Sequence, residues 1–202
     1  MIKSYFPYLL LLLVSFEGLS QTRTQTTLDY QNRIHPEISS GFMVVSQNSH
    51  ATEAGYEILK KGGNAVDASV AIGFALAVTL PRAGNLGGGG FVLIYDKEKD
   101  DVTSIDYRSA APKSATSDLF IHDNRVVRFG HLVNSVPGSV AGLLKAHQDH
   151  GTLPLAYLLM PALRLARDGF AVTHDLTYVL EWGNESMLSN AFSSNTFSSA
   201  NP

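Results

Sequence analysis

Residues 62–96 read GGNAVDASVAIGFALAVTLPRAGNLGGGGFVLIYD, and this stretch decides the fold. It opens with a helix signal, because Asn64 lies three residues before Asp67 in the arrangement of a reciprocal capping box. The apolar run that follows is rich in alanine and glycine, whose small size allows close backbone approach on nearly every face. We therefore expect a helix that is packed against a sheet and ended by Pro81.

The glycines between this helix and the next apolar run raise the question of phosphate binding. Nucleotide-binding loops run from strand to glycine turn to helix, so that the helix N-terminus faces the phosphate. Here the order is reversed, and Gly90 stands where a phosphate loop has its lysine. Phosphate binding is therefore disfavoured. Two interpretations stay open: a tight helix-to-strand passage with positive φ and close backbone packing, or a loop that lines an active site.

The segments around this stretch predict further elements. Residues 42–46 are apolar and β-branched at their centre, which predicts a buried strand. A helix is expected to follow, with Ser49 as its cap and Gly62 and Gly63 as its left-handed stop. Residues 91–96 and 102–108 predict a β-hairpin around a charged turn, with alternation weak enough for both faces to be covered.

Two more helices are expected further along the chain. The first has Pro137 in its first turn and Gly151 just past its end, and the second is stopped by Gly169. From Ser186 the chain is rich in serine and asparagine and contains no closing element, so it resembles a chain that stops within a domain.

The composition is that of a globular protein. The chain has 202 residues, of which 45% are hydrophobic, which is enough for one domain with a core. A formal net charge of −3 provides no basic field for nucleic acid. The absence of cysteine excludes disulfides and thiolate zinc sites.

The N-terminus has the pattern of a secretory signal peptide: Lys3, about a dozen apolar residues, and then small residues. The apolar run is shorter than the roughly 20 residues that cross a bilayer, although an uncleaved anchor remains the alternative. We assign residues 1–20 to the signal peptide, residues 21–40 to an extended lead-in and residues 41–202 to a partial domain. A secreted or periplasmic location is expected, and membrane anchoring is less favoured.

Several motifs then occur in one order: the opening stretch, SIDYRSAAP, VPGSVAGL and ARDGF. Together they resemble the N-terminal part of the large subunit of a γ-glutamyltranspeptidase, from about Gly41 to Phe170. The resemblance implies an α+β fold, the αββα sandwich of the N-terminal nucleophile hydrolases, with only its N-terminal portion present. In that family a precursor cuts itself into a large and a small subunit, and the threonine at the new N-terminus of the small subunit is the nucleophile.

The resemblance also implies a reaction. It is γ-glutamyl transfer from glutathione or another γ-glutamyl donor to water, an amino acid or a dipeptide, through a γ-glutamyl-enzyme intermediate, with no cofactor and no metal. No part of the chain resembles the nucleophile segment, so we expect no catalytic residue here and an inactive fragment without the small subunit from the same precursor. Two alternatives stay open: a related hydrolase of poly-γ-glutamate or β-lactam side chains, and an inactive truncated product.

Arg108, in DYRSAAP, matches the family's arginine that binds the α-carboxylate of the γ-glutamyl donor. The chemistry fits this role, because a guanidinium stays charged and its planar fork binds a carboxylate through two hydrogen bonds. The alternative is a structural arginine that pairs with a nearby carboxylate such as Asp106. Lysine at this position should weaken donor binding, because a point charge does not reproduce the fork.

Other polar residues carry weaker signals. His147 and His150 share a helical face, but no third ligand stands at metal spacing. His50 is explained by its place at a helix N-terminus, and Asp67 by its capping position. Asn184-Glu185-Ser186 fits the glycosylation pattern, which matters only in a host that glycosylates secreted proteins.

Overall fold

A computed structural model gives the fold and divides the chain into two units, Met1–Ser40 and Gly41–Pro202. The helices and strands that the structure describes all belong to the second unit. The predicted signal peptide and most of the predicted lead-in lie outside the described part of the chain. The structure describes residues 38–122, 125–126 and 133–188.

The first described helix is α2 (Ser49–Lys60). Its cap is Asn48, whose side chain accepts hydrogen bonds from two backbone N–H groups of the first turn, at 3.0 and 3.4 Å. The prediction of Ser49 as the cap was wrong by one residue, because the cap needs extended backbone and residue 49 is already helical. The predicted left-handed stop is confirmed at Gly62, whose φ is +88°, and was wrong for Gly63, whose φ lies outside the left-handed region.

Helix α3 (Ala65–Thr79) begins as its sequence predicts. The Asp67 N–H donates to Asn64 Oδ1 at 2.9 Å, and the Asn64 N–H donates to Asp67 Oδ2 at 3.0 Å, which completes the capping box. The helix ends at Thr79 with Leu80 as its C-cap, because the helical conformation is disfavoured at the residue before Pro81.

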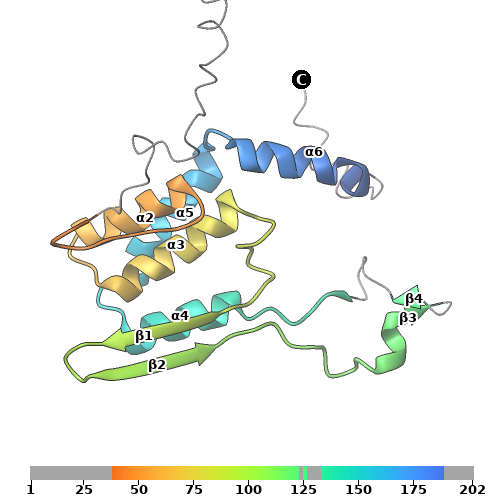
Figure 1. The fold of residues 1–202 in the computed structure, drawn as a ribbon, viewed down its shortest axis with the longest axis horizontal. Helices are drawn as coiled ribbons and strands as arrows, with labels where there is room; N and C mark the ends of the chain where they lie inside the picture. Colours follow the sequence, from red (N-terminus) through yellow and green to blue (C-terminus); the bar gives the residue numbers. More distant parts are fainter. Residues whose placement is uncertain (1–37, 123–124, 127–132, 189–202) are drawn as a thin grey trace, which may run out of the picture. The chain divides into compact units, whose positions relative to one another are not determined.

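Helix α3 is the centre of the core (Figure 1). It packs against α2, α4 (Ser139–His150) and α5 (Leu155–Asp168). The expectation of a helix packed against a sheet therefore holds only in part, because three helices supply most of the contacts and the sheet adds only its inner side chains. The buried cluster consists of Ile58, Val66, Ala68, Val70, Ala71, Ala146 and Leu158.

The predicted hairpin is confirmed. Strands β1 (Phe91–Asp96) and β2 (Asp101–Asp106) pair antiparallel, with Phe91 opposite Asp106. Alternate side chains, Val92 and Ile94 among them, pack against the core cluster. The other face is open in the described part of the chain, as expected for a sheet that belongs to a partial domain. Its apolar residues are Phe91, Leu93, Tyr95 and Val102, which are 60 to 74% exposed.

The strand predicted at residues 42–46 does not form in this structure. A strand needs a partner for its N–H and C=O groups, and no strand pairs with this segment among the described residues. Met43 and Val45 are exposed. The Val44 side chain instead lies over α2, where its Cγ1 is 3.1 Å from the position that a Cβ on Gly55 would take.

Helices α4 and α5 match the two helices expected in the second half of the chain. Gly151 and Gly169 end them as predicted, and Gly169 has a φ of +79°. The placement of Pro137 in the first turn of α4 was wrong, because Gly138 is the cap and the proline precedes it. Helix α4 begins at this point because its first N–H groups donate hydrogen bonds to the backbone of the glycine run.

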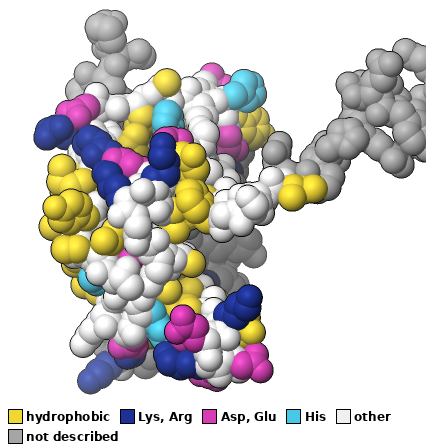
Figure 2. Space-filling model, turned by 90° about the vertical axis from the view of Figure 1, so that its left-hand side faces the viewer, with side chains coloured by type: hydrophobic (Ala, Val, Ile, Leu, Met, Phe, Trp, Pro, Cys, Tyr) yellow, Lys and Arg dark blue, Asp and Glu magenta, His cyan; other side chains and the backbone are white. Residues whose placement is uncertain are grey.

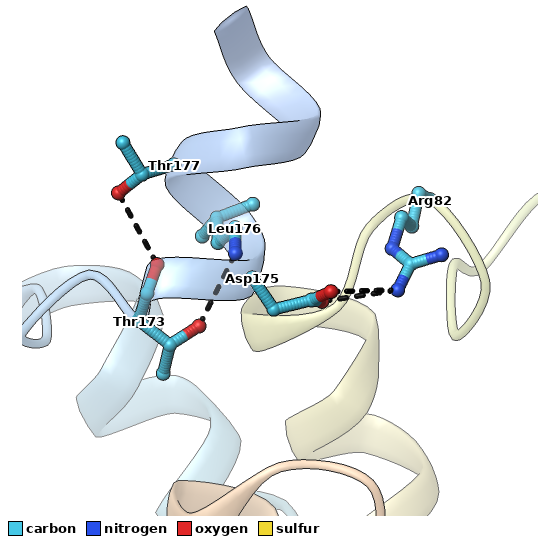
Figure 3. Close-up of polar contacts among 5 residues, drawn as sticks. All are labelled: Arg82, Thr173, Asp175, Leu176 and Thr177. Carbon is cyan, nitrogen blue, oxygen red and sulfur yellow. Dashed lines mark hydrogen bonds and ion pairs between the residues drawn. The ribbon is translucent and has the colours of Figure 1, made fainter. Parts of the chain in front are cut away.

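Helix α6 (His174–Leu188) is an element that the sequence analysis did not predict. The Leu176 N–H donates to Thr173 Oγ1 at 3.3 Å, which caps its first turn. One guanidinium nitrogen of Arg82 donates to both carboxylate oxygens of Asp175, at 3.0 and 3.1 Å (Figure 3). This ion pair ties α6 to the segment that follows α3.

The described residues between β2 and α4 form short elements: a 3₁₀ turn (Ser117–Phe120) and the two-residue strands β3 (Ile121–His122) and β4 (Arg125–Val126), which pair antiparallel. Figure 2 shows one face of the molecule, on which hydrophobic side chains lie exposed among charged side chains of both signs. Within the described ranges, every helix is too short or too polar to span a membrane.

Candidate functional site

Arg108 lies two residues past the end of β2, and its side chain is exposed. Its backbone N–H donates to Asp106 Oδ1 at 2.9 Å. The guanidinium itself makes no ion pair or hydrogen bond within the described part of the chain. Asp106 therefore binds the backbone N–H of Arg108 and not its guanidinium. The predicted alternative, a structural ion pair between Arg108 and Asp106, does not form in this structure.

Tyr107 points to the opposite side of the chain from Arg108, as strand alternation requires. Its ring is half-buried against two glycines, and its backbone carbonyl lies against a third. A Cβ on Gly90 would lie 2.9 Å from Tyr107 Cε2, and a Cβ on Gly142 would overlap the ring itself. A Cβ on Gly138 would overlap the carbonyl oxygen of Tyr107. Burial raises the pKa of the Tyr107 phenol above its ordinary value.

The glycine run lies directly beside Arg108. Gly90 and Tyr107 exchange two backbone hydrogen bonds, N–H of Tyr107 to O of Gly90 at 3.0 Å and the reverse bond at 3.3 Å. A Cβ on Gly89 would lie 2.9 Å from the carbonyl carbon of Arg108 and would overlap the backbone nitrogen of Ser109. The predicted close packing is thus confirmed.

The predicted positive φ is wrong for this run. Among the described glycines only Gly62 and Gly169 have a φ in the left-handed region. At Gly89 the neighbouring backbone leaves no room for a side chain, and at Gly90 the Tyr107 ring leaves none. The turn itself needs no unusual backbone conformation.

The glycine run also caps α4. The N–H groups of Gly138 and Ser139 both donate to the carbonyl oxygen of Gly88, at 2.8 and 3.1 Å. The Ser139 hydroxyl donates to the carbonyl oxygen of Asn85 at 3.2 Å. A phosphate cradle needs free N–H groups at a helix N-terminus, and here the protein's own backbone accepts those bonds.

A groove lies next to this cluster. It is lined mainly by apolar residues of α3, β1 and α4, and Tyr107 forms part of its wall. Arg108 is not among the lining residues. The structure therefore brings Tyr107 and the glycines together around the backbone of Arg108, while the guanidinium extends into solvent.

The family model for gamma-glutamyltranspeptidase matches residues 51–201 of this chain, which includes this whole cluster. The chain belongs to the γ-glutamyltranspeptidase family. The match starts ten residues after the beginning of the resemblance seen in the sequence. It continues past Phe170 through the whole of α6.

Individual γ-glutamyltranspeptidases and related acylases support the same assignment. The chain is 47% identical over 161 residues to the glutathione hydrolase proenzyme of Escherichia coli K12, covering 77% of this chain and 28% of that protein. It is 37% identical to the solved Helicobacter pylori γ-glutamyltranspeptidase, with a TM-score of 0.76, covering 81% of this chain and 48% of that one. A cephalosporin acylase from Bacillus halodurans is 27% identical with a TM-score of 0.65, covering 80% and 31%.

These similarities bear on the fold as well as on the family. The α+β class is confirmed by the helices and hairpin of the structure and by its solved relatives. The chain spans about a quarter of the length of the curated relatives that it matches. The prediction of Arg108 as a substrate-binding residue stays a prediction.

The remaining polar candidates have structural partners. Asp67 is fully buried and accepts hydrogen bonds from the N–H of Thr152 at 3.0 Å and from its hydroxyl at 2.5 Å, in addition to the capping box. His147 Nε2 lies 2.7 Å from the carbonyl oxygen of Leu153, and His50 Nε2 lies 3.2 Å from that of Ala171.

The histidines and the glycosylation pattern were the other candidates from the sequence. Within the part of the chain that the structure describes, no group of three or more His, Asp or Glu residues is placed to hold a metal. Asn184-Glu185-Ser186 lies in α6, and its side chains fall outside the described residues.

Sequence reasoning missed two residues of the cluster, Gly89 and Tyr107. The signal for Tyr107 was present, since strand alternation places residue 107 inward when residue 108 faces outward. Gly89 carried no such signal, because its contact with residues 108 and 109 depends on how β2 continues beside the glycine run.

Proposed function

We propose that the complete protein containing this chain transfers γ-glutamyl groups from glutathione or a related γ-glutamyl amide to water, an amino acid or a dipeptide. The single observation that carries this proposal is the 47% identity over 161 residues to a protein named glutathione hydrolase proenzyme. The identity to solved γ-glutamyltranspeptidases, 37 and 36%, supports the same reaction class.

In this proposal Arg108 binds the α-carboxylate of the donor. An exposed guanidinium without a partner among the described residues is available for an anion from solution. Two parallel N–H···O bonds would fix the direction of the donor as well as its charge. The nucleophilic threonine of the small subunit would then attack the γ-carbonyl, form an ester and release the amine, and water or an acceptor amine would resolve the ester.

We also propose the cellular location of the protein and its subunit partner. The N-terminal residues would direct the precursor out of the cytoplasm, to the periplasm or the medium. The present chain would belong to the large subunit, whose partner is the small subunit cut from the same precursor. No cofactor, metal or nucleic acid takes part.

A second candidate function is hydrolysis of a β-lactam side chain. It is supported by the likeness to the cephalosporin acylase of Bacillus halodurans. The γ-glutamyltranspeptidases are preferred because their identity to this chain is higher, 37% against 27% in the solved structures. The remaining alternative is an inactive truncated product, which would catalyse no reaction.

The test uses the complete open reading frame that contains this chain and the release of a coloured amine from a γ-glutamyl anilide. We expect self-cleavage into two subunits and turnover of the anilide. Arg108→Ala should lower kcat/KM about 10- to 100-fold, as expected for the loss of hydrogen bonds to a charged group, and Arg108→Lys should lie between that variant and the wild type. Arg167→Ala, which removes an exposed arginine at the end of α5, is the matched control.

The outcomes separate the candidates. An unchanged KM for the anilide in Arg108→Ala would remove the site assignment and leave the family intact. Turnover of a cephalosporin side chain in place of the γ-glutamyl anilide would select the second candidate. A stop codon after Pro202 together with no activity would select the inactive product.

A further inference from the structure

Backbone hydrogen bonds hold the chain on both sides of Arg108, although the Arg108 side chain is exposed. Tyr107 is paired with Gly90 through two backbone hydrogen bonds, and Ala110 exchanges two more with Val136, at 2.8 and 3.1 Å. The Arg108 N–H is bonded to Asp106. The backbone is therefore fixed before and after Arg108, and the direction of the Arg108 Cα–Cβ bond is fixed with it.

The Tyr107 ring is wedged into a space that only glycines leave open. It contacts Gly90 in the glycine run and Gly142 in α4, and its carbonyl oxygen lies against Gly138. Its hydroxyl makes no hydrogen bond among the described residues, so the ring acts through its shape. Because the ring fits between β1 and α4, it prevents the chain from rotating about the strand direction at residue 107.

Gly89 packs against the backbone of residues 107–109. A side chain there would lie 2.6 Å from the carbonyl oxygen of Tyr107 and 2.9 Å from the carbonyl carbon of Arg108. Both atoms are backbone, so an added Cβ is accommodated only if the Tyr107–Ser109 backbone moves. Gly87, two residues earlier, is different: a Cβ there would meet only Asn85 Oδ1, at 3.3 Å.

We propose that Gly89 and Tyr107 are positioning residues, which set the direction of the Arg108 guanidinium and thereby the preference for donors that carry an α-carboxylate. This inference rests on the proposed function of Arg108. A two-point hydrogen bond to a carboxylate depends on orientation, so a backbone shift at residue 108 weakens it while leaving chemistry on donors without the carboxylate unchanged.

The experiment compares two donors on the complete protein: a γ-glutamyl anilide and the 4-aminobutanoyl anilide, which is the same molecule without the α-carboxylate. The measured quantity is the ratio of the two kcat/KM values, which does not depend on the fraction of enzyme that is folded. Gly89→Ala should lower this ratio about 10- to 100-fold, by raising KM for the γ-glutamyl donor alone. Gly87→Ala, the same change in the same run, should leave it unchanged.

Tyr107 gives a second and independent variant pair. Tyr107→Leu removes the wedge and should lower the ratio in the same direction, whereas Tyr107→Phe keeps the ring and should preserve it. If Gly89→Ala yields no active enzyme, the Tyr107→Leu ratio decides the inference.

The outcomes distinguish this inference from the proposed function. If Arg108→Ala lowers the ratio while Gly89→Ala and Tyr107→Leu leave it at the wild-type value, the positioning role is overturned and the role of Arg108 stands. If Arg108→Ala itself leaves the ratio unchanged, the assignment of Arg108 fails and the positioning role fails with it. A parallel fall of kcat/KM for both donors in Gly89→Ala and Tyr107→Leu would mean a structural effect only and would also overturn the inference.

Discussion

Asp67 is a fully buried carboxylate that joins two parts of the chain. It closes the capping box of α3 and accepts hydrogen bonds from Thr152, 85 residues later, and from the N–H of Leu153. Burial alone would raise its pKa, but the hydrogen bonds from Thr152, Asn64 and Leu153 together outweigh that effect, and its pKa lies below the ordinary 3.8. At the residue scale, this side chain stabilises the junction between α3 and the α4–α5 loop.

Asp67→Ala should therefore destabilise the fold. The substitution leaves the N–H donors of residues 64, 152 and 153 without their buried acceptor, which costs about 1–3 kcal/mol. The measurement is the free energy of unfolding in urea. Ser69→Ala, which removes an exposed hydroxyl from the same helix, is the control and should change it by less than about 0.5 kcal/mol.

The pKa shift of Asp67 adds a pH dependence to this prediction. A carboxyl group whose pKa is lower in the folded state contributes stability that is fully present above the unfolded value and lost as the pH falls through the folded value. We expect wild-type stability to fall below about pH 4 and the Asp67→Ala variant to lose less over the same range. Equal acid sensitivity of both proteins would contradict this.

At the scale of elements, the β1–β2 hairpin has two unlike faces. Val92 and Ile94 pack against the helical core, while Leu93 and Tyr95 on the other face are 74 and 61% exposed. An open apolar face of this kind promotes association. The hairpin has a regular antiparallel register. Its open apolar face is expected to lower the solubility of this chain.

Leu93→Lys should raise the soluble yield of the 202-residue chain and change its free energy of unfolding by less than about 0.5 kcal/mol. The matched variant is Val92→Lys, one position along the same strand, which places a charge against the core and should unfold the protein. Soluble yield and urea unfolding of both variants are the measurements. Equal destabilisation by both substitutions would show that the outer face is packed after all.

At the scale of the whole second unit, Arg82 and Asp175 join segments that are 93 residues apart (Figure 3). Their side chains are 40 and 54% exposed, so solvent and salt screen the attraction between them. The pair fixes where the N-terminus of α6 meets the segment after α3, although its energy is small.

A double-mutant cycle of Arg82→Ala and Asp175→Ala should give a coupling of about 0.2–1 kcal/mol, which decreases as salt is raised toward about 1 M. Unfolding in urea at several salt concentrations measures it. The local Lys145–Asp149 pair within α4 is the control, with an expected coupling of about 0.3–0.5 kcal/mol. A coupling that is insensitive to salt would mean that the Arg82–Asp175 pair is buried from solvent.

The amino-acid sequence by itself determined the local features of this protein. The capping box at residues 64–67, the stops at Gly62 and Gly169 and the β1–β2 hairpin depend on residues a few positions apart, and the structure contains all of them. The order of motifs was enough to identify the family and to single out Arg108. These signals are readable because backbone conformation and capping involve near neighbours in the chain.

Tertiary structure decided everything that depends on distant partners. Residues 42–46 form no strand because no neighbouring strand accepts their hydrogen bonds among the described residues. The carbonyl of Gly88 caps α4 from 50 residues away, and Asp67 bonds to Thr152 over 85 residues. Gly89 is required because the backbone of Arg108 occupies the space beside it. A sequence pattern does not reveal such contacts, because they depend on which segments lie side by side after folding.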